Sequence, residues 1–453
     1  MQPDLGGLRG RLEAIVGGAH VGVGPAEGTR YAVDGVSPAL SVRPGSQEEV
    51  VATVAACAEA GAAIIPWGGG TAMGLGNPPS RADVVVVLER LNRIVDHDVA
   101  NLNVSVEGGM RLADLQATLA LQRQYLPLDP PAERQATIGG LIATNGSGPT
   151  RLLYGTARDW VLGMRVVLPD GERIRCGGKV IKNVSGYDMN KLFIGSLGSL
   201  GIITEVTFKL LPAPVVRAGV IGVFPDLGQA AKIVAKVLDS VLLPEAMELL
   251  NPEAVSLLAP PLGLAGPAGY GLAVALAGTP ETVERQARDF AGIFKAGQAG
   301  GVTSLQSDRS VPAWQAIRNV FDLLSGPPAE RLICKIAVPI SRSAEFLGAA
   351  EQMGRRHNLR AAVTAHAGSG IVRACYLLAK EAPPEVLGSD LERLRREAEA
   401  AEGSLVLQTA PPALKKHVDA WGKPGEAFDV MRRLKADFDS RGLCNPGRFL
   451  GGI

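Results

Sequence analysis

A run of glycines directly after an apolar stretch is the feature of this sequence with the clearest chemical consequence. Residues 64–76 read Ile-Ile-Pro-Trp-Gly-Gly-Gly-Thr-Ala-Met-Gly-Leu-Gly, which predicts a strand that ends in a loop almost free of side chains. Without Cβ atoms, successive backbone N–H groups can converge on one anion. Each such bond to a phosphate oxygen is charge-assisted and contributes about 1.5–3 kcal/mol, so a few of them hold a diphosphate. A glycine-rich turn without a ligand is the alternative for this run alone.

Two further loops rich in small residues follow the first one. Residues 136–148 read Ala-Thr-Ile-Gly-Gly-Leu-Ile-Ala-Thr-Asn-Gly-Ser-Gly. Residues 193–206 read Phe-Ile-Gly-Ser-Leu-Gly-Ser-Leu-Gly-Ile-Ile-Thr-Glu-Val, so that glycine recurs every third residue before a strand. Neither G-x-G-x-x-G nor G-x-x-x-x-G-K-[ST] occurs in the chain. The two commonest nucleotide-binding loops are therefore excluded.

The order of these loops, closed by Cys-Asn-Pro-Gly-Arg-Phe at 444–449, resembles the FAD-binding domain of the vanillyl-alcohol oxidase/para-cresol methylhydroxylase (PCMH) type. The resemblance covers residues 31–214 and resumes at 444–449. It implies an α+β fold, with a two-subdomain PCMH-type FAD-binding domain and an α+β cap domain of the FAD-linked oxidase C-terminal type. It also implies FAD as the cofactor.

The same resemblance implies which residues contact FAD. Around the diphosphate these are Pro66, Gly68, Gly69, Gly70 and Thr71. Along the isoalloxazine and ribityl groups they are Ala136, Thr137, Gly139 and Gly140, with Asn145, Ser147 and Gly148 nearby. Ile203 is expected against the adenosine half and Asn445 near the ring edge. Many relatives bond FAD through a histidine beside the first loop, but residues 66–70 contain neither His nor Cys, so FAD is expected to be noncovalent. His97 is predicted to lie in a surface turn.

A second group of polar residues, at 364–373, reads Thr-Ala-His-Ala-Gly-Ser-Gly-Ile-Val-Arg. It resembles a degenerate H-x-G-D-G-N-L-H, the metal motif of the D-2-hydroxy-acid dehydrogenases in this superfamily. His366 keeps the first histidine, whereas Ser369 and Arg373 stand at the aspartate and second-histidine positions. Metal sites of this kind need at least three protein ligands. No metal is therefore expected.

Oxidation of a 2-hydroxy acid at such a site requires a cationic clamp for the carboxylate and a base for the hydroxyl proton. Arg318, Lys335 and Arg373 are the candidates for the clamp, and His366 is the candidate for the base. The alternatives are that Arg318 and Lys335 are solvated or paired with acids, and that His366 is a packed strand histidine.

A narrower resemblance rests on residues 178–188, on Gly-Ser-Leu-Gly at 195–198 and on Trp-Gly-Lys-Pro at 421–424. These resemble the smaller FAD-binding subunit of glycolate oxidase, which stands beside a larger flavoprotein subunit and an iron–sulfur subunit. The resemblance implies oxidation of glycolate or lactate, with electrons leaving through a partner. A non-catalytic electron-transfer or scaffold subunit is the main alternative, and an oxidase of sugar or aldonolactone type ranks lower.

The composition sets limits on these functions. The 46 basic and 45 acidic residues give a net charge of +1, so neither nucleic acid nor another polyelectrolyte is implied as a partner. Five cysteines without C-x-x-C spacing argue against disulfides and against an iron–sulfur cluster in this chain. No apolar run reaches the length of a transmembrane segment and no secretory leader is evident, so a cytoplasmic protein is expected.

The elements that must position these residues can be read from local patterns. A helical lead-in is expected at 1–30, the FAD-binding domain at 31–214, the cap at 215–415, and a last helix and tail that return to the FAD domain at 416–453. Ser46 predicts the start of a helix that Gly61 ends. The Asp-Gly turn at 170–171 predicts a hairpin. In the cap, strand-like runs are predicted at 220–224, 272–276, 333–338, 370–378 and 405–408.

Overall fold

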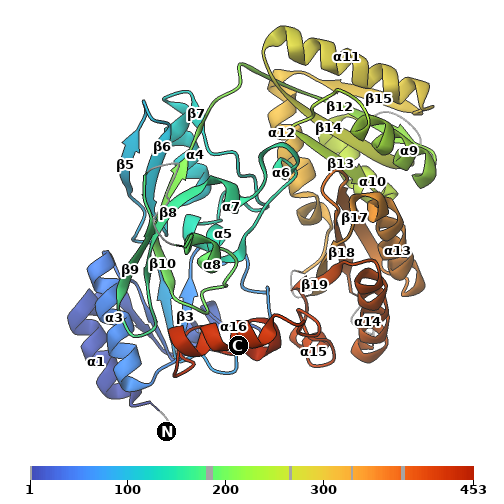
Figure 1. The fold of residues 1–453 in the computed structure, drawn as a ribbon. Helices are drawn as coiled ribbons and strands as arrows, with labels where there is room; N and C mark the ends of the chain where they lie inside the picture. Colours follow the sequence, from blue (N-terminus) through green and yellow to red (C-terminus); the bar gives the residue numbers. More distant parts are fainter. Residues whose placement is uncertain (1–2, 180–186, 265–267, 328–329, 379–382) are drawn as a thin grey trace. The chain divides into compact units, whose positions relative to one another are not determined.

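The structure is a computed structural model that describes residues 3–179, 187–264, 268–327, 330–378 and 383–453. Residues 180–186, the centre of the run that carries the narrower resemblance, lie outside these ranges. The chain folds into two compact units. Unit 1 contains Met1–Gly146, Thr156–Ala213 and Lys423–Ile453, and unit 2 contains Ser147–Gly155 and Pro214–Gly422. Mixed helix and sheet occur in both (Figure 1), in agreement with the predicted α+β class.

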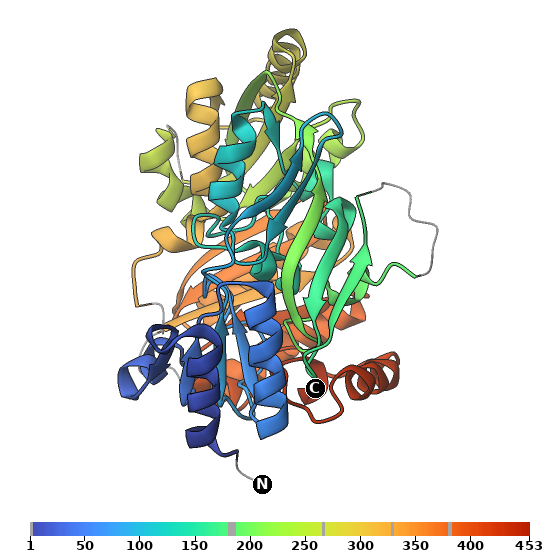
Figure 2. The same ribbon diagram turned by 90° about the vertical axis from the view of Figure 1, so that its left-hand side faces the viewer.

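The first sheet of unit 1 is short and mainly parallel. Its order is β1 (Val21–Val23), β2 (Leu40–Val42), β4 (Val84–Val87) and β3 (Ile64–Trp67). Two neighbouring helices, α1 (Leu5–Val16) and α3 (Gln47–Ala60), lie side by side on it (Figure 2). The predicted helix after Ser46 is confirmed, since the Ser46 side chain accepts from Glu49 N and Gly61 adopts the left-handed conformation that ends α3.

The second sheet of unit 1 is antiparallel. Its order is β5 (Ile94–Asp98), β6 (Asn103–Glu107), β10 (Ile202–Lys209), β8 (Val161–Val167) and β9 (Arg173–Gly177). The predicted hairpin is confirmed by the pairing of β8 with β9. The prediction for His97 was wrong, because His97 lies in β5 and its Nε2 is 2.9 Å from Gln124 Oε1. The remaining helices of unit 1 are α2 (Pro25–Arg30), α4 (Leu112–Ala120), α5 (Ile138–Thr144), α7 (Ala157–Trp160), α8 (Asn190–Phe193) and α16 (Phe428–Phe438).

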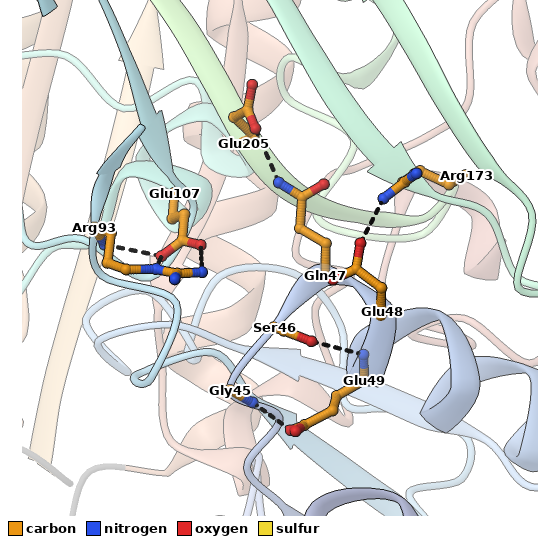
Figure 3. A network of polar contacts seen from close by, with 9 residues as sticks. All are labelled: Gly45, Ser46, Gln47, Glu48, Glu49, Arg93, Glu107, Arg173 and Glu205. Carbon is orange, nitrogen blue, oxygen red and sulfur yellow. Dashed lines mark hydrogen bonds and ion pairs between the residues drawn. The ribbon is translucent and has the colours of Figure 1, made fainter. Parts of the chain in front are cut away.

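Polar contacts fasten the start of α3 to the second sheet (Figure 3). Gln47 Nε2 donates to Glu205 Oε2 over 2.9 Å, and Arg173 donates to Glu48 over 3.0 Å. Glu205 stands directly opposite Glu107 in the ladder, and like charges in that position repel. Arg93 offsets this repulsion, since its guanidinium holds Glu107 at 2.8 and 3.2 Å. The two sheets of unit 1 are therefore joined by charge-assisted bonds as well as by apolar packing.

Unit 2 is built on one eight-stranded sheet. Its order is β15 (Gly301–Leu305), β12 (Val216–Phe224), β14 (Tyr270–Gly278), β13 (Ala246–Leu250), β17 (Arg360–His366), β18 (Ile371–Leu377), β16 (Arg331–Ala337) and β19 (Ser404–Thr409). The five predicted cap strands are confirmed and correspond to β12, β14, β16, β18 and β19, although the predicted ranges extend one residue beyond the end of β16 and one residue beyond each end of β18. The sequence reading missed β13, β15 and β17.

Helices cover the sheet of unit 2 on both faces. One face packs against α9 (Leu227–Leu238), α11 (Pro280–Ala296), α13 (Ser343–Arg356) and α14 (Pro384–Ala400). On the other face, α10 (Pro252–Leu262) and α12 (Ser307–Arg318) cover an apolar cluster. The short helices are α6 (Arg151–Tyr154) and α15 (Pro412–Lys415). Along β16, Leu332, Cys334 and Ile336 face the first core, so Lys335 points to the opposite face.

The last part of the chain is anchored in unit 1 by a buried ammonium group. Lys435 on α16 donates to Asp439 Oδ2 at 2.6 Å, to the Ser199 carbonyl at 2.7 Å and to the Cys444 carbonyl at 3.0 Å. Asp439 in turn accepts from the backbone of Leu443 and Cys444. The ammonium thus makes three hydrogen bonds, of which two organise the tail and the third joins it to the loop at 196–201.

Replacement of Lys435 by Met is expected to destabilise the protein by about 3–5 kcal/mol, because it leaves the Asp439 carboxylate buried without its cation. The measurement is guanidinium denaturation followed by circular dichroism. Arg432→Met is the matched control on the same helix, since Arg432 is exposed and its ion pair is with the exposed Asp429. Equal midpoints for the two variants would contradict the anchoring role.

Candidate flavin site and candidate catalytic residues

The glycines at 68–70 are required by close backbone packing. A Cβ on Gly68 would overlap the Thr137 hydroxyl, and one on Gly69 would overlap the Gln135 carbonyl oxygen. Gly70 has φ +73°, a conformation that favours glycine. The loop after β3 therefore lies directly against the turn at 135–137 that begins α5. These are two of the three loops that the resemblance assigns to FAD.

A cavity of about 570 Å³ lies beside this contact, within the range of ligand sites in proteins. The side of the cavity formed by the two loops consists of Trp67, Gly68, Gly69 and Thr137. The rest of its wall consists of Arg30, Tyr31, Val87, Glu89, Asn92, Gly109, Arg111 and Asp114. The glycines thus bring the two loops together, and the cavity beside them has the size expected of a ligand site.

Two asparagines have buried side-chain carbonyl oxygens (Oδ1) that accept no hydrogen bond from the described residues. Asn145 ends α5 and Asn445 follows the last helix, and both have φ near +48°. The Nδ2 group of Asn445 donates to the Leu197 carbonyl, which fixes the direction of its amide. Since an unsatisfied buried acceptor costs about 1–3 kcal/mol, both groups fit a ligand with hydroxyl or N–H donors, such as FAD.

The terminal Asn-Pro-Gly-Arg segment binds backbone carbonyls of the glycine loop. The Arg448 guanidinium donates to the carbonyls of Met73 (2.8 Å) and Leu75. In return, the Arg448 carbonyl accepts from Asn77 N over 3.0 Å, and a Cβ on Gly76 would crowd it. Burial lowers the pKa of Arg448 to about 10, although Asp34 opposes this shift. Because these loop carbonyls are engaged by Arg448, the loop keeps one conformation.

The other residues that the resemblance assigns to FAD are distributed as follows. Ile203 is buried. Its carbonyl oxygen lies so close to Gly108 and Gly139 that a Cβ on Gly139 would be 3.2 Å from it. Ala136 is buried at the turn before α5, and Gly140 N donates to Thr137 Oγ1 at 3.4 Å. Ser147 and Gly148 belong to unit 2. Their contact with FAD, like the other assignments, stays a prediction.

Unit 2 brings three of the four predicted catalytic residues to one face of its sheet. Lys335 on β16 stands opposite Arg373 on β18, and Arg373 stands opposite Thr364 on β17. His366 ends β17 two residues beyond Thr364, so it shares this face. The fourth residue, Arg318, is half-buried at the end of α12, which packs on β12 and β15.

Two cations lie side by side in this register. Burial, together with the nearby charges of Arg151 and Arg373, lowers the pKa of Lys335 to about 8. Burial likewise lowers the pKa of Arg373, against the attraction of Glu248. Arg373 Nε donates to Gln408 at 3.3 Å and its guanidinium lies 5.0 Å from the Phe321 ring centre. Lys335 has no hydrogen-bond or ion-pair partner among the described residues. Neighbouring cations of this kind have the charge that would attract an anion such as a carboxylate.

His366 is paired with an acid that sequence reasoning missed. Glu248 on β13 stands opposite His366, and its Oε1 contacts Nδ1 of the ring. An acid within the apolar run Ala-Met-Glu-Leu-Leu at 246–250 was the signal that could have revealed it. Within the described ranges, no group of three or more His, Cys, Asp or Glu side chains is arranged to hold a metal ion.

Comparison with known proteins places this geometry in a family. Residues 38–177 match the family described as FAD binding domain, and residues 213–449 match FAD linked oxidases, C-terminal domain. The second match covers more than half of the chain. The chain belongs to the FAD-linked oxidase family. It is an FAD-binding oxidoreductase with the PCMH-type fold.

The relatives include several 2-hydroxy-acid enzymes. The chain is 28% identical to glycolate oxidase subunit GlcD of Bacillus subtilis, over 91% of this chain and 88% of that protein. It is 32% identical to D-lactate dehydrogenase of Anaerostipes hadrus, over 74% and 72%. The structure of p-cresol methylhydroxylase with bound substrate shares the fold, with a TM-score of 0.77 at 18% identity, over 98% and 96% of the chains. Among the described residues, no helix is long and apolar enough to span a membrane.

Replacement of Gly69 by Ala is expected to weaken FAD binding at least tenfold, because the new Cβ cannot fit against the Gln135 carbonyl and the loop must move. The measurement is titration of the apoprotein with FAD, followed by flavin fluorescence. Gly425→Ala, where a Cβ meets no atom within 4 Å, is the control in the same unit. Unchanged affinity in Gly69→Ala would show that this loop does not hold the cofactor.

The pKa of Lys335 predicts how anion binding depends on pH. With a pKa of about 8, the ammonium is charged at neutral pH and loses its proton above pH 8. The affinity for 2-hydroxyisobutyrate, which has no hydrogen on Cα and cannot be oxidised there, is expected to fall as pH rises from 7 to 9.5. Calorimetric titration measures it. Lys335→Arg stays charged across this range, so its affinity should stay nearly constant; parallel declines would contradict the assignment.

Proposed function

We propose that the protein oxidises a small 2-hydroxy acid, such as glycolate or D-lactate, to the 2-oxo acid and passes the electrons through FAD to a partner. The observation that carries the proposal is the face of the unit 2 sheet on which a histidine–glutamate pair lies in the same register as two cations. A carboxylate is the natural ligand of Lys335 and Arg373. The hydroxyl group next to that carboxylate needs the base that His366 offers.

Each residue has a separate task in this reaction. Lys335 and Arg373 bind and orient the substrate carboxylate, and Arg318 is a further candidate for the same task. His366 accepts the proton of the 2-hydroxyl group, which contributes about 10²–10⁴ in rate. FAD, when bound, supplies the two-electron acceptor. We assign residues 31–214 and the tail to FAD binding and residues 215–415 to the substrate.

The names of the relatives support this class of substrate. Glycolate, D-lactate and D-2-hydroxyglutarate, the substrates in the names of the relatives from B. subtilis, A. hadrus and Bos taurus, are all 2-hydroxy acids. Absence of a covalent bond to FAD is part of the proposal, because Thr71 and its neighbours offer no histidine or cysteine.

A partner is part of the proposal because the described residues contain neither a disulfide nor a cysteine cluster that could serve as a second redox group. All five cysteines are free and buried. Burial raises the pKa of Cys57 and of Cys334 to about 12, which leaves both thiols unreactive. We propose a larger flavoprotein subunit and an iron–sulfur subunit as partners and the cytoplasm as the location. The word subunit in the name of the B. subtilis relative supports an assembly.

A non-catalytic FAD-binding subunit is the second candidate. Ser369 and Arg373, which occupy the aspartate and second-histidine positions of the degenerate motif, favour it. In that case the cations would bind a structural or regulatory anion, and another subunit would carry out the oxidation.

Anaerobic mixing of the purified FAD-loaded protein with glycolate or D-lactate decides between the two. Oxidation of the substrate by this chain is expected to bleach the visible flavin band, whereas the simple acids acetate and propionate, which lack the hydroxyl, should leave it unchanged. A spectrum that stays constant with a panel of 2-hydroxy acids, in protein that dithionite does bleach, would favour the non-catalytic subunit.

A further inference from the structure

The side chains of Glu248 and His366 form a buried pair across two strands of unit 2. They are direct partners in the antiparallel ladder of β13 and β17, and Oε1 of the acid contacts Nδ1 of the ring. Their side chains are 2% and 5% exposed. A carboxylate is a costly group to bury, and a bare one persists only when it is paired. The ring is the partner of Glu248 in this pair.

The contact decides which ring nitrogen can act as a base. An ionised carboxylate can only accept hydrogen bonds. Nδ1 must therefore carry a hydrogen and donate a hydrogen bond to Glu248. In the neutral ring the lone pair then lies on Nε2. Among the described residues, Nε2 takes part in no hydrogen bond. One nitrogen is therefore occupied, and the other is left available to a ligand.

Two cations, Arg373 and Lys335, share the face of the sheet on which the pair lies. Arg373 on the neighbouring strand β18 is close enough to Glu248 to interact with it electrostatically. Lys335 on β16 interacts with Arg373 and with Arg151 of α6, a helix that contacts β13. A substrate anion attracted by these cations is brought to the same face of the sheet as Nε2.

We infer that Glu248 is a positioning residue that holds His366 in the tautomer with Nε2 as the proton acceptor for the 2-hydroxyl group. The inference rests on the proposed function. The substrate O–H bond breaks, its proton goes to Nε2, and its electron pair becomes the carbonyl bond as the hydride leaves Cα, with FAD as the two-electron acceptor. The Glu248 carboxylate, which contacts Nδ1, stabilises the imidazolium that forms.

Replacement of Glu248 by Gln tests the positioning role. The amide can donate to Nδ1 as well as accept from it, so the ring loses its enforced tautomer. The rate of anaerobic flavin reduction is expected to fall at least hundredfold, while KM for the substrate stays within about threefold, because the cations that bind the carboxylate are unchanged. Glu248→Asp, which keeps the charge, should recover at least a tenth of the wild-type rate.

The chain offers a matched control in the same unit. His357 Nε2 lies 2.7 Å from Asp390 Oδ2. This second histidine–carboxylate pair joins the end of α13 to α14, on the face of the sheet opposite to Lys335. Asp390→Asn makes the same chemical change and is expected to leave kcat within about twofold of wild type. A comparable loss in both variants would reduce the effect to general damage and overturn the inference.

A measurement on the wild-type protein tests the inference without any variant. In ¹⁵N-histidine NMR, the His366 ring is expected to show a protonated Nδ1 and an unprotonated Nε2, with the signal assigned by its loss in His366→Gln. The opposite tautomer would overturn the inference even if Glu248→Gln fails to fold. If wild-type flavin is not bleached by any 2-hydroxy acid, the proposed function fails; if it is bleached and Glu248→Gln reacts equally fast, only the role of Glu248 fails.

Discussion

Hydrogen bonds from the C-terminal tail to the glycine loops fix the conformation of these loops in unit 1. The buried ammonium of Lys435 fixes the tail to the loop at 196–201, and Asn445 N donates to the Ile64 carbonyl at the start of β3. Arg448 then engages the carbonyls of the loop that follows β3. Segments separated by more than 350 residues thus meet at one point. A glycine loop has many conformations in isolation, and the tail selects one of them.

The same logic explains why charged groups are buried around that loop. Burial lowers the pKa of Arg448 to about 10, a cost that a neutral side chain would not carry. A guanidinium is nevertheless suited to the position, because each terminal nitrogen carries two N–H groups, and Nη2 of Arg448 donates to both carbonyls. Lys435 is used in the same way with three acceptors. In both cases a buried cation binds backbone carbonyls in or next to the glycine-rich loops.

In unit 2 two neighbouring cations and a histidine–glutamate pair lie on one face of the sheet. Lys335 and Arg373 repel each other across the ladder, and like charges in that position destabilise a sheet. Around them the two layers of helices and the apolar clusters supply the stability. Glu248 and His366 are instead mutually satisfied through one nitrogen of the ring. Two neighbouring cations, of which Lys335 has no hydrogen-bond or ion-pair partner among the described residues, beside an oriented imidazole are the arrangement expected of a binding face.

The sequence by itself determined the elements and loops that depend on neighbours in the chain. Ser46 and Gly61 fixed the ends of α3, the Asp-Gly turn fixed the hairpin of β8 and β9, and the three glycine loops indicated FAD, because caps, turns and Cβ-free loops act over a few residues. Tertiary structure alone decided that Glu248 meets His366 and that Arg448 meets Leu75, since strand register and chain return join residues more than a hundred positions apart. It also placed His97 in a strand, where Nε2 of its ring is hydrogen-bonded to Gln124 Oε1.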